Sequence, residues 1–269
     1  MKLIFKKIHR TLLKYGFDAV KFIKALNPQN KSWYYADLKE LKRQKATDNT
    51  FEIGPMYAIL TDKFDEGGTM KGHYFHQDLY VARLINLAKP VKHLDIGSRA
   101  DGFIAHVASF REIELIDIRA IKSKVKNIVF RQADLMELPT DMTDYCDSVS
   151  SLHAIEHFGL GRYGDPINYY GHIKAINNIT KILKNGGVFY FSVPIGPQRI
   201  EFNAHRVFSV EYLVNILSQN FEIRSFSYVD DKGDFFENAL LTSENMISDF
   251  GCHYGCGIFT LIKNKPLPA

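Results

Sequence analysis

The segment "VKHLDIGSRADGF", residues 91–103, has the pattern of a buried strand that ends in a tight turn and leads into a helix. Asp95 and Gly97 stand where the strand ends, and Gly102 opens the helix. In open α/β sheets, ligands bind at the carboxyl ends of the parallel strands. The segment therefore predicts the start of an α/β domain and one wall of its binding crevice.

Two phosphate-binding motifs are excluded at this turn. Gly97 and Gly102 have the spacing of a P-loop, but Phe103 and Ile104 follow where that motif has lysine and a hydroxyl residue. The dinucleotide motif G-x-G-x-x-G is absent because position 99 is Arg. The turn therefore retains three residues that a binding site could use: the carboxylate of Asp95, the turn glycine Gly97, and Gly102 at the start of the helix.

From residue 90 onward, apolar strand patterns alternate with helical ones, which predicts a doubly wound, mainly parallel sheet. Helices are expected over residues 102–110, over 167–187 with Gly186 and Gly187 at the end, and over 209–220. Seven strands are expected, at residues 91–98, 112–119, 127–135, 146–154, 188–194, 221–230 and 256–264. We assign residues 89–269 to this domain and residues 1–88 to a helical N-terminal extension or lid.

Positive charge is concentrated at the N-terminus. Residues 1–26 carry seven Lys and Arg against one Asp, whereas the whole chain has a net charge of +4. The rest is thus slightly negative, which argues against a nucleic-acid surface. Two interpretations of the helical pattern stay open: packing on its own domain or on a second copy, as in a homodimer, and peripheral contact with an anionic membrane. The apolar positions are Ile4, Ile8, Leu12, Leu13, Phe17, Val20 and Ile23.

Composition places the chain among soluble globular proteins. The 269 residues are 46% hydrophobic and 24% charged, and no apolar run is long enough to span a bilayer. The first residues do not form a secretory signal, and three cysteines make no disulfide framework. We expect a reduced, cytoplasmic protein, either free or peripheral to the inner face of the membrane.

Two further acids stand at predicted strand ends. Asp117 follows Gly97 by twenty residues and could accept hydrogen bonds from both ribose hydroxyls, while Asp134 could accept one from the amine of an adenine. Each acid alone also fits a helix cap or a solvated loop. Together with Asp95, they predict a crevice for a nucleoside-containing ligand.

The ordered segments "HLDIGS", "LIDIR", "QADL", "DSVSSLHAIEH" and "LKNGGVFYFSVP" resemble class I S-adenosylmethionine-dependent methyltransferases over residues 90–263. More closely, "GHYFHQDLYVARLI", "EHFGLGRYGDP" and "NAHRVFS" resemble a methyltransferase-like domain of unknown function from bacteria and nematodes. The resemblance implies a seven-stranded Rossmann-like sheet and S-adenosylmethionine as cofactor. It implies that Asp95 and Gly97 contact the methionine part, Asp117 the ribose, and Asp134 and Leu135 the adenine, with Ser98, Gly102, Ile118 and His153 also at the cofactor.

The chain departs from this family at the first turn. Arg99 and Asp101 stand where the family has glycines, which allow the backbone to approach a ligand closely. This departure predicts either a reshaped loop or weaker cofactor binding.

The segment "SLHAIEHFGLGRYGDP", residues 151–166, contains the H-x-x-E-H pattern of some zinc hydrolases. Here it follows a strand, so we predict a loop facing cofactor and acceptor. His157 is the first candidate general base and His205 the second, with Glu156 orienting a histidine or the acceptor. In some quinone-pathway O-methyltransferases of similar fold, this place holds a divalent cation, so a metal at His153, Glu156 and His157 remains an alternative, as does a structural role for His153.

Six residues are predicted to bind the acceptor. Arg162 suits a carboxylate or phosphate and Asp165 a hydroxyl, although their glycine-rich segment also fits a structural turn. The other four are His73, Tyr74, His76 and Arg206. "GCHYGCG", residues 251–257, has no second ligand pair, so we predict no metal ligand there.

The polar mouth of the crevice predicts O-methylation of a small polar acceptor, such as a sugar or sugar-nucleotide of surface polysaccharide synthesis, and no nucleic-acid partner. Arg99 and Asp101 keep open a second interpretation, a non-catalytic scaffold with the methyltransferase fold. A third is a metal-dependent enzyme using the histidine cluster.

Overall fold

The computed structural model describes residues 28–60, 62–138 and 140–264, together with residues 9, 12, 16–19 and 22. The chain divides into two compact units, Met1–Thr69 and Met70–Ala269. Most of the predicted basic helix of residues 1–26 lies outside the described residues. Among the described residues, no helix combines the length and apolar character that crossing a membrane requires.

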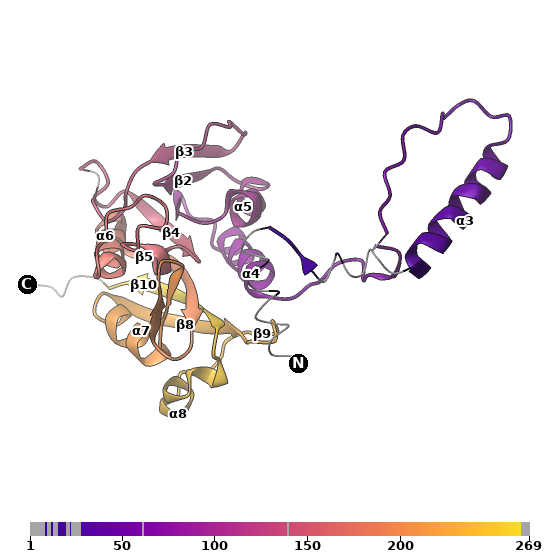
Figure 1. The fold of residues 1–269 in the computed structure, drawn as a ribbon. Helices are drawn as coiled ribbons and strands as arrows, with labels where there is room; N and C mark the ends of the chain where they lie inside the picture. The colour runs from indigo at the N-terminus through magenta and orange to yellow at the C-terminus, as the bar shows by residue number, and fades with distance from the viewer. Residues whose placement is uncertain are drawn as a thin grey trace, which may run out of the picture. The chain divides into compact units, whose positions relative to one another are not determined.

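The first unit is organised around helix α3, Pro28–Lys45 (Figure 1). The short 3-10 helix η1, Asp62–Phe64, packs against it. Phe64 meets the ring of Trp33 edge-on at 6.4 Å between centroids, and the ammonium of Lys63 lies 4.4 Å from the same ring centroid. Lys63 also forms an ion pair of 2.7 Å with Asp37. A mixed aromatic and charged contact therefore joins the two helices.

The second unit contains one eight-stranded sheet in the order β3-β2-β1-β4-β5-β10-β8-β9. In the part of the sheet from β3 to β5, all neighbouring strands are parallel. Strand β10 lies between β5 and β8 and is antiparallel to both. The doubly wound fold is confirmed: all seven predicted strands are present and β9 extends their sheet. The strands are β1 (His93–Ile96), β2 (Ile113–Asp117), β3 (Ile128–Gln132), β4 (Cys146–Leu152), β5 (Leu183–Ile195), β8 (Phe221–Val229), β9 (Phe235–Phe236) and β10 (Gly255–Lys263).

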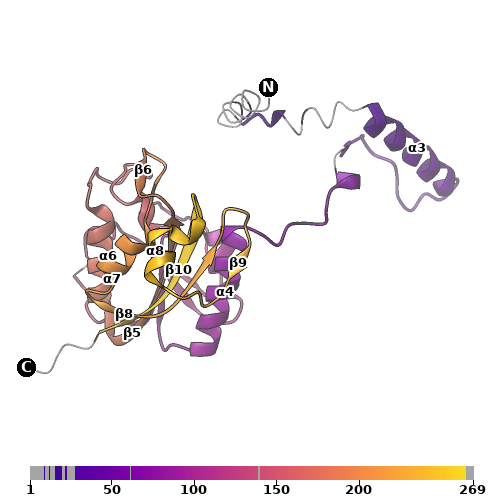
Figure 2. The same ribbon diagram turned by 90° about the horizontal axis from the view of Figure 1, so that it is seen from below.

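Helices cover both faces of this sheet (Figure 2). On one face, α4 (His73–Ala88), the π-helical turn η2 (Ala100–Ile104) and α5 (Ala105–Ala108) supply apolar side chains to one core. On the other face, α6 (Gly171–Ile182) and α7 (Val210–Leu217) supply the second core. The smaller elements are η3 (Ile155–His157), β6 (Arg199–Glu201), β7 (His205–Val207), α8 (Ser243–Ile247) and η4 (Asp249–Gly251).

Two boundaries differ from the sequence expectation. The division into units lies before α4 rather than after residue 88, because Val81 and Ile85 of α4 are fully buried in the second unit. The helix expected over residues 167–187 is shorter, because Leu183 already pairs with Cys146 of β4 and begins β5. The pair Gly186-Gly187 therefore lies inside a strand and does not end a helix.

We predict that Phe259→Ala lowers the free energy of unfolding by about 3–5 kcal/mol, because a large buried ring is replaced by a cavity. Phe259 is fully buried on β10, and its ring centroid lies 4.7 Å from that of Phe226 on β8. Val91→Ala is the control, since Val91 is 91% exposed, and it should change stability by less than about 0.5 kcal/mol. Urea unfolding measures both, and equal effects would contradict the proposed core.

Candidate active site

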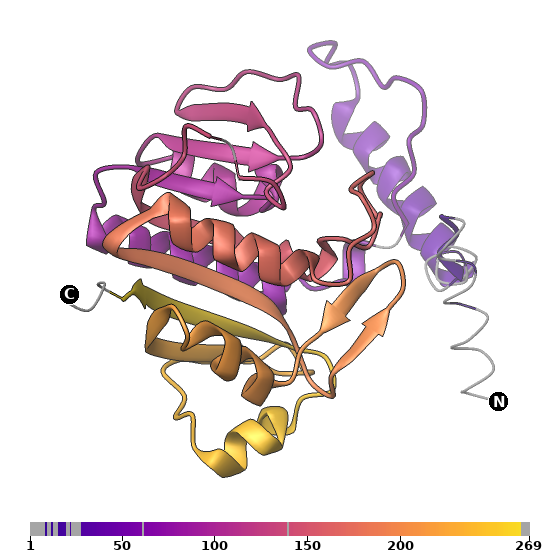
Figure 3. The same ribbon diagram turned by 90° about the vertical axis from the view of Figure 1, so that its left-hand side faces the viewer.

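A pocket of about 550 Å³ opens at the carboxyl ends of β1, β2 and β4. Figure 3 shows the β6–β7 hairpin and the loop before α6 at the end of the sheet toward which the parallel strands point. Most of the predicted site residues line this pocket. They are Tyr74, Gly97, Asp117, Ile118, Asp134, Leu135, His153, Glu156, His157, Arg162, Asp165 and His205.

Asp95, at the end of β1, lies beneath the pocket wall and not in it. It is fully buried and accepts hydrogen bonds from the backbone N–H and hydroxyl of Ser98, at 3.0 and 2.7 Å, and from the hydroxyl of Ser150 at 2.5 Å. Burial nevertheless raises the pKa of Asp95 to about 7. The hydroxyl of Ser98 also accepts from the N–H of Leu152 at 3.0 Å. Asp95 and Ser98 thus fix the turn after β1 to the end of β4.

The two glycines of this turn have different roles. Gly97 has a φ of +70°, and a Cβ there would lie 3.0 Å from the Cβ of Ala154, so the position favours glycine on both counts. Gly102 does not line the pocket: a Cβ there would lie 2.6 Å from a carboxylate oxygen of Asp78. Burial raises the pKa of Asp78 to about 6. Gly97 forms pocket wall, while Gly102 makes room for a buried acid.

Arg99 and Asp101, in the turn after β1, form an ion pair with each other. The Arg99 guanidinium donates to both carboxylate oxygens of Asp101, at 3.1 and 3.0 Å, and lies 5.0 Å from the ring centroid of Tyr74. Both side chains are more than half exposed. Arg99 lines the pocket, so the loop carries a positively charged side chain beside the predicted cofactor position.

Asp117, at the end of β2, already has a charged partner. Arg119 donates to its two carboxylate oxygens at 3.0 and 2.8 Å, and the Arg119 backbone N–H donates to one of them at 2.8 Å. The guanidinium also lies 4.2 Å from the ring centroid of Tyr163. A ribose at Asp117 would have to share this carboxylate with Arg119 or displace it.

Asp134, Leu135 and Ile118 form the part of the pocket beyond Asp117. One carboxylate oxygen of Asp134 accepts from the N–H of Met136 at 2.8 Å, which closes a turn. Leu135 is almost fully buried. This region therefore combines an apolar surface with a carboxylate, which suits a flat heterocycle carrying an amine.

The H-x-x-E-H residues come directly after β4, as predicted. Glu156 is almost fully buried, and one of its oxygens lies 2.8 Å from Nδ1 of His153 and 3.6 Å from Nε2 of His157. Burial opposes ionisation, but the neighbouring His153 lowers the pKa of Glu156, so this group is a carboxylate. The arrangement is an acid shared by two imidazoles.

His157 has the geometry of a base. Its Nδ1 lies 2.6 Å from the carbonyl of Ala204 and donates to it, which leaves Nε2 unprotonated in the neutral ring. Burial lowers the pKa of His157. His205 lines the same pocket, 6.5 Å from His157 between ring centroids, and packs on Tyr254 at 5.1 Å. The structure thus brings both candidate bases together.

Arg162 and Asp165 lie in the loop before α6, but only Arg162 offers a free charge. Its guanidinium donates to the carbonyl of Ala204 at 2.8 Å and has no carboxylate partner within the part of the chain that the structure describes. Asp165 accepts from the backbone N–H groups of Gly159, Gly161 and Tyr163 at 2.8–3.2 Å and so shapes the loop. Arg162 can therefore attract an anionic group.

Three predicted acceptor-binding residues do not line the pocket. Arg206 is buried and donates to backbone carbonyls, with Phe158 at 2.6 Å and Tyr169 at 3.1 Å the shortest. His76 stacks on Phe235 at 5.4 Å. His73 stacks on His153 at 5.2 Å, behind the pocket residue. Arg206 therefore supports the loop, since its guanidinium donates hydrogen bonds to backbone carbonyl groups and not to a ligand.

Sequence reasoning missed several apolar pocket residues and three with polar side chains, Arg119, Tyr163 and Tyr254. The signal for Arg119 was present, because it follows the strand-end Asp117 by two residues. Tyr163 lies within the segment already singled out, between Arg162 and Asp165. Tyr254 lies before β10, a strand with no predicted site residue, and only the tertiary fold reveals it.

A family model described as "Caenorhabditis protein of unknown function, DUF268" matches residues 104–249, more than half of the chain. The chain belongs to this family. The nematode-linked resemblance seen in the sequence is thereby confirmed. No curated protein sequence matches the chain significantly.

Solved structures share the fold of this DUF268 member. A 1,6-didemethyltoxoflavin-N1-methyltransferase of Burkholderia thailandensis, with 1,6-didemethyltoxoflavin and S-adenosylhomocysteine bound, has a TM-score of 0.51 and 17% identity, covering 70% of this chain and 79% of that one. A putative sarcosine dimethylglycine methyltransferase from Galdieria sulphuraria has a TM-score of 0.50 and 13% identity, covering 70% and 86%. The fold is that of class I methyltransferases.

We predict that Arg206→Lys lowers the free energy of unfolding by about 2–4 kcal/mol, because a lysine cannot reach all the buried carbonyls that the guanidinium serves. Arg224→Lys is the matched control, since Arg224 is 71% exposed. Urea unfolding of both variants measures the change in the free energy of unfolding. Equal stabilities would show that Arg206 does not support the loop.

Proposed function

We propose that this chain is an S-adenosylmethionine-dependent methyltransferase that methylates an oxygen of a small polar acceptor carrying an anionic group, such as a sugar-nucleotide. The observation that carries the proposal is the two-part pocket. Acids at the ends of β2 and after β3 lie at one part, and histidines and an unpaired arginine lie at the other. Ligands in open α/β sheets bind at this edge.

The cofactor part comprises Gly97, Asp117, Ile118, Asp134 and Leu135. Gly97 allows close approach of the backbone, Asp117 is placed for ribose hydroxyls, and Asp134 with Leu135 suits an adenine. When bound, S-adenosylmethionine supplies a methyl group on a sulfonium. The pocket volume of about 550 Å³ lies within the usual range for cofactor sites.

The acceptor part supplies alignment, proton removal and charge. Methyl transfer requires the attacking oxygen to lie in line with the sulfonium bond. The neutral His157 can take the hydroxyl proton at Nε2, and the Glu156 carboxylate beside it stabilises the imidazolium that results. Arg162 can hold a phosphate or carboxylate of the acceptor. His205 is the second candidate base.

A non-catalytic protein with the same fold is the second candidate. The ion pair between Asp117 and Arg119 favours it, because that contact occupies the carboxylate a cofactor ribose would use. Cofactor binding separates the two candidates. The cytoplasmic location, the homodimer and the contact of residues 1–26 with a membrane surface remain proposals that accompany the first.

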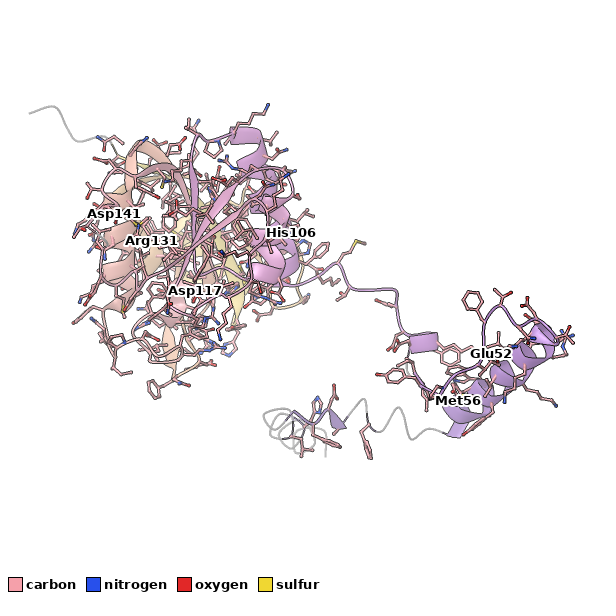
Figure 4. All side chains as sticks on the ribbon, turned by 90° about the horizontal axis from the view of Figure 1, so that it is seen from above. Glu52, Met56, His106, Asp117, Arg131 and Asp141 are labelled. Carbon is pink, nitrogen blue, oxygen red and sulfur yellow. The ribbon has the colours of Figure 1, made fainter. Side chains whose placement is uncertain are left out.

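We predict that the wild-type chain binds S-adenosylhomocysteine in the micromolar range and that Asp117→Asn weakens binding about tenfold or more, because charged hydrogen bonds to the ribose are lost. Asp141→Asn is the matched control: it also breaks an arginine–carboxylate pair, with Arg131, outside the pocket (Figure 4). Calorimetry measures all three. Absence of binding by the wild type would favour the non-catalytic candidate.

We predict that kcat/KM rises with pH and levels off above a pKa lower than 6.5, since burial lowers the pKa of His157 and its neutral form is the base. Charges of Glu156, Arg162 and His153 also act on this ring. Methyl transfer to a panel of sugar-nucleotides provides the assay. In His157→Asn, kcat should fall about 100-fold or more and this pH dependence should disappear, while S-adenosylhomocysteine still binds. A retained pH profile would assign the base elsewhere, with His205→Asn as the next variant.

A further inference from the structure

Three metal-ligating side chains from distant parts of the chain meet behind the pocket wall. His73 begins α4, His153 follows β4, and Cys256 lies in β10. One ligand atom of each lies within 4.8 Å of those of the other two. Within the residues that the structure describes, this is the one such group of three or more histidine, cysteine or acidic side chains.

The two ring nitrogens of His153 differ in their hydrogen bonding. Its Nδ1 lies 2.8 Å from the carboxylate of Glu156, whereas its Nε2 is buried and makes no hydrogen bond of good geometry; the Cys256 side chain is its polar neighbour. His153 is only 8% exposed. A buried polar atom left unpaired is costly, so a native structure usually supplies a partner. A single ligand lying between His73, His153 and Cys256 would provide such a partner for all three side chains.

The surroundings of the cluster match those of a metal centre. Histidines that bind metals usually donate their second ring nitrogen to a carboxylate or a backbone carbonyl. His153 has Glu156 in this position, and His73 has a hydrogen bond to the backbone of Tyr254. Cys256 is fully buried. Its side chain contacts that of His153, and its other sulfur contacts are long, 3.6 Å to Gln77 and 3.9 Å to the carbonyl of Gly257.

We propose that His73, His153 and Cys256 bind a zinc ion. Two imidazoles and a thiolate form a set that zinc prefers, and tetrahedral coordination needs ligand atoms roughly 3.3–3.6 Å apart. From the 4.8 Å limit, the ligand atoms would therefore have to approach one another by at most about 1.2–1.5 Å. Burial opposes protonation of His153, but the neighbouring Cys256 and Glu156 raise its pKa well above the ordinary value. Zinc binding therefore releases two protons to solvent, one from the thiol of Cys256 and one from Nε2 of His153. The charges of the thiolate and of Glu156 then balance the divalent ion.

Three protein ligands leave a fourth position for water or another small ligand, as in catalytic zinc sites. Because His153 also lines the pocket, the ion would lie at the pocket wall. This site differs from the H-x-x-E-H set considered from the sequence, since Glu156 acts here through His153 and His157 takes no part. It also assigns a ligand, Cys256, to the segment 251–257, where the sequence spacing predicts none, because its partners come from distant parts of the chain. The proposal does not depend on methyltransferase activity, because its readout is metal content.

The test uses the full-length chain, purified without chelator and exposed to zinc. Mass spectrometry of the metal content should give about one zinc ion per chain, and Cys256→Ser should lose at least nine-tenths of it. Cys252→Ser is the matched control, because Cys252 is a second buried cysteine close in sequence and outside the cluster. This control should retain the zinc.

Cobalt provides an independent readout. The wild type and Cys252→Ser loaded with Co²⁺ should show thiolate-to-metal charge-transfer absorption and the intense visible bands of tetrahedral cobalt, whereas Cys256→Ser should lack the charge-transfer band. If Cys256→Ser does not fold, His73→Ala serves instead, since His73 is only partly buried, and it should lose zinc while keeping its circular dichroism. Substoichiometric zinc in the wild type, or equal zinc in Cys256→Ser and Cys252→Ser, would overturn the proposal.

Discussion

The buried carboxylate of Glu156 constrains the rest of the site. A charge removed from water is costly unless it is paired, and two imidazoles, those of His153 and His157, lie against the same oxygen. This pairing orients both rings. The backbone that carries Glu156 is held in turn by Arg206, which donates to the carbonyl groups of this loop. The acceptor part of the pocket is therefore held in place by buried polar contacts before any ligand binds.

The fold could be predicted because its sheet is encoded locally. Short apolar runs such as "HLDI", "IELID" and "VFYFSVP" are bounded by turn residues, and their alternation with helical patterns leaves few topologies. The errors lie where tertiary pairing decides the element. Leu183 joins β5 because Cys146 pairs with it, although "KILKNGG" reads as the end of a helix. Similarly, α4 belongs to the second unit because its apolar face covers the sheet. The sequence of the helix alone does not indicate which unit its apolar face packs against.

The site was predictable to the extent that sheet topology determines it. Parallel strands place their carboxyl ends at one edge, so Gly97, Asp117, His153 and His157 were expected together, and all line one pocket. Side-chain pairing was not predictable in this way. Whether Arg206 reaches a ligand or a backbone carbonyl depends on packing between segments forty residues apart or more. The cluster of His73, His153 and Cys256 spans most of the second unit and has no sequence spacing by which it could be recognised.

The two parts of the pocket differ in how firmly their side chains are held. Asp117 is buried, but its partner Arg119 is half exposed, and Arg99 pairs with Asp101 at the surface. The exposed pair of Arg99 and Asp101 contributes at most about 1 kcal/mol, because solvent screens the charges and the long side chains lose entropy. At Asp117, the hydroxyls of a ribose would donate to the same carboxylate oxygens as the half-exposed guanidinium of Arg119 and could replace it. Arg99 in the turn after β1 and Arg119 at Asp117 are thus compatible with a cofactor site, and their positive charge favours an anionic acceptor next to it.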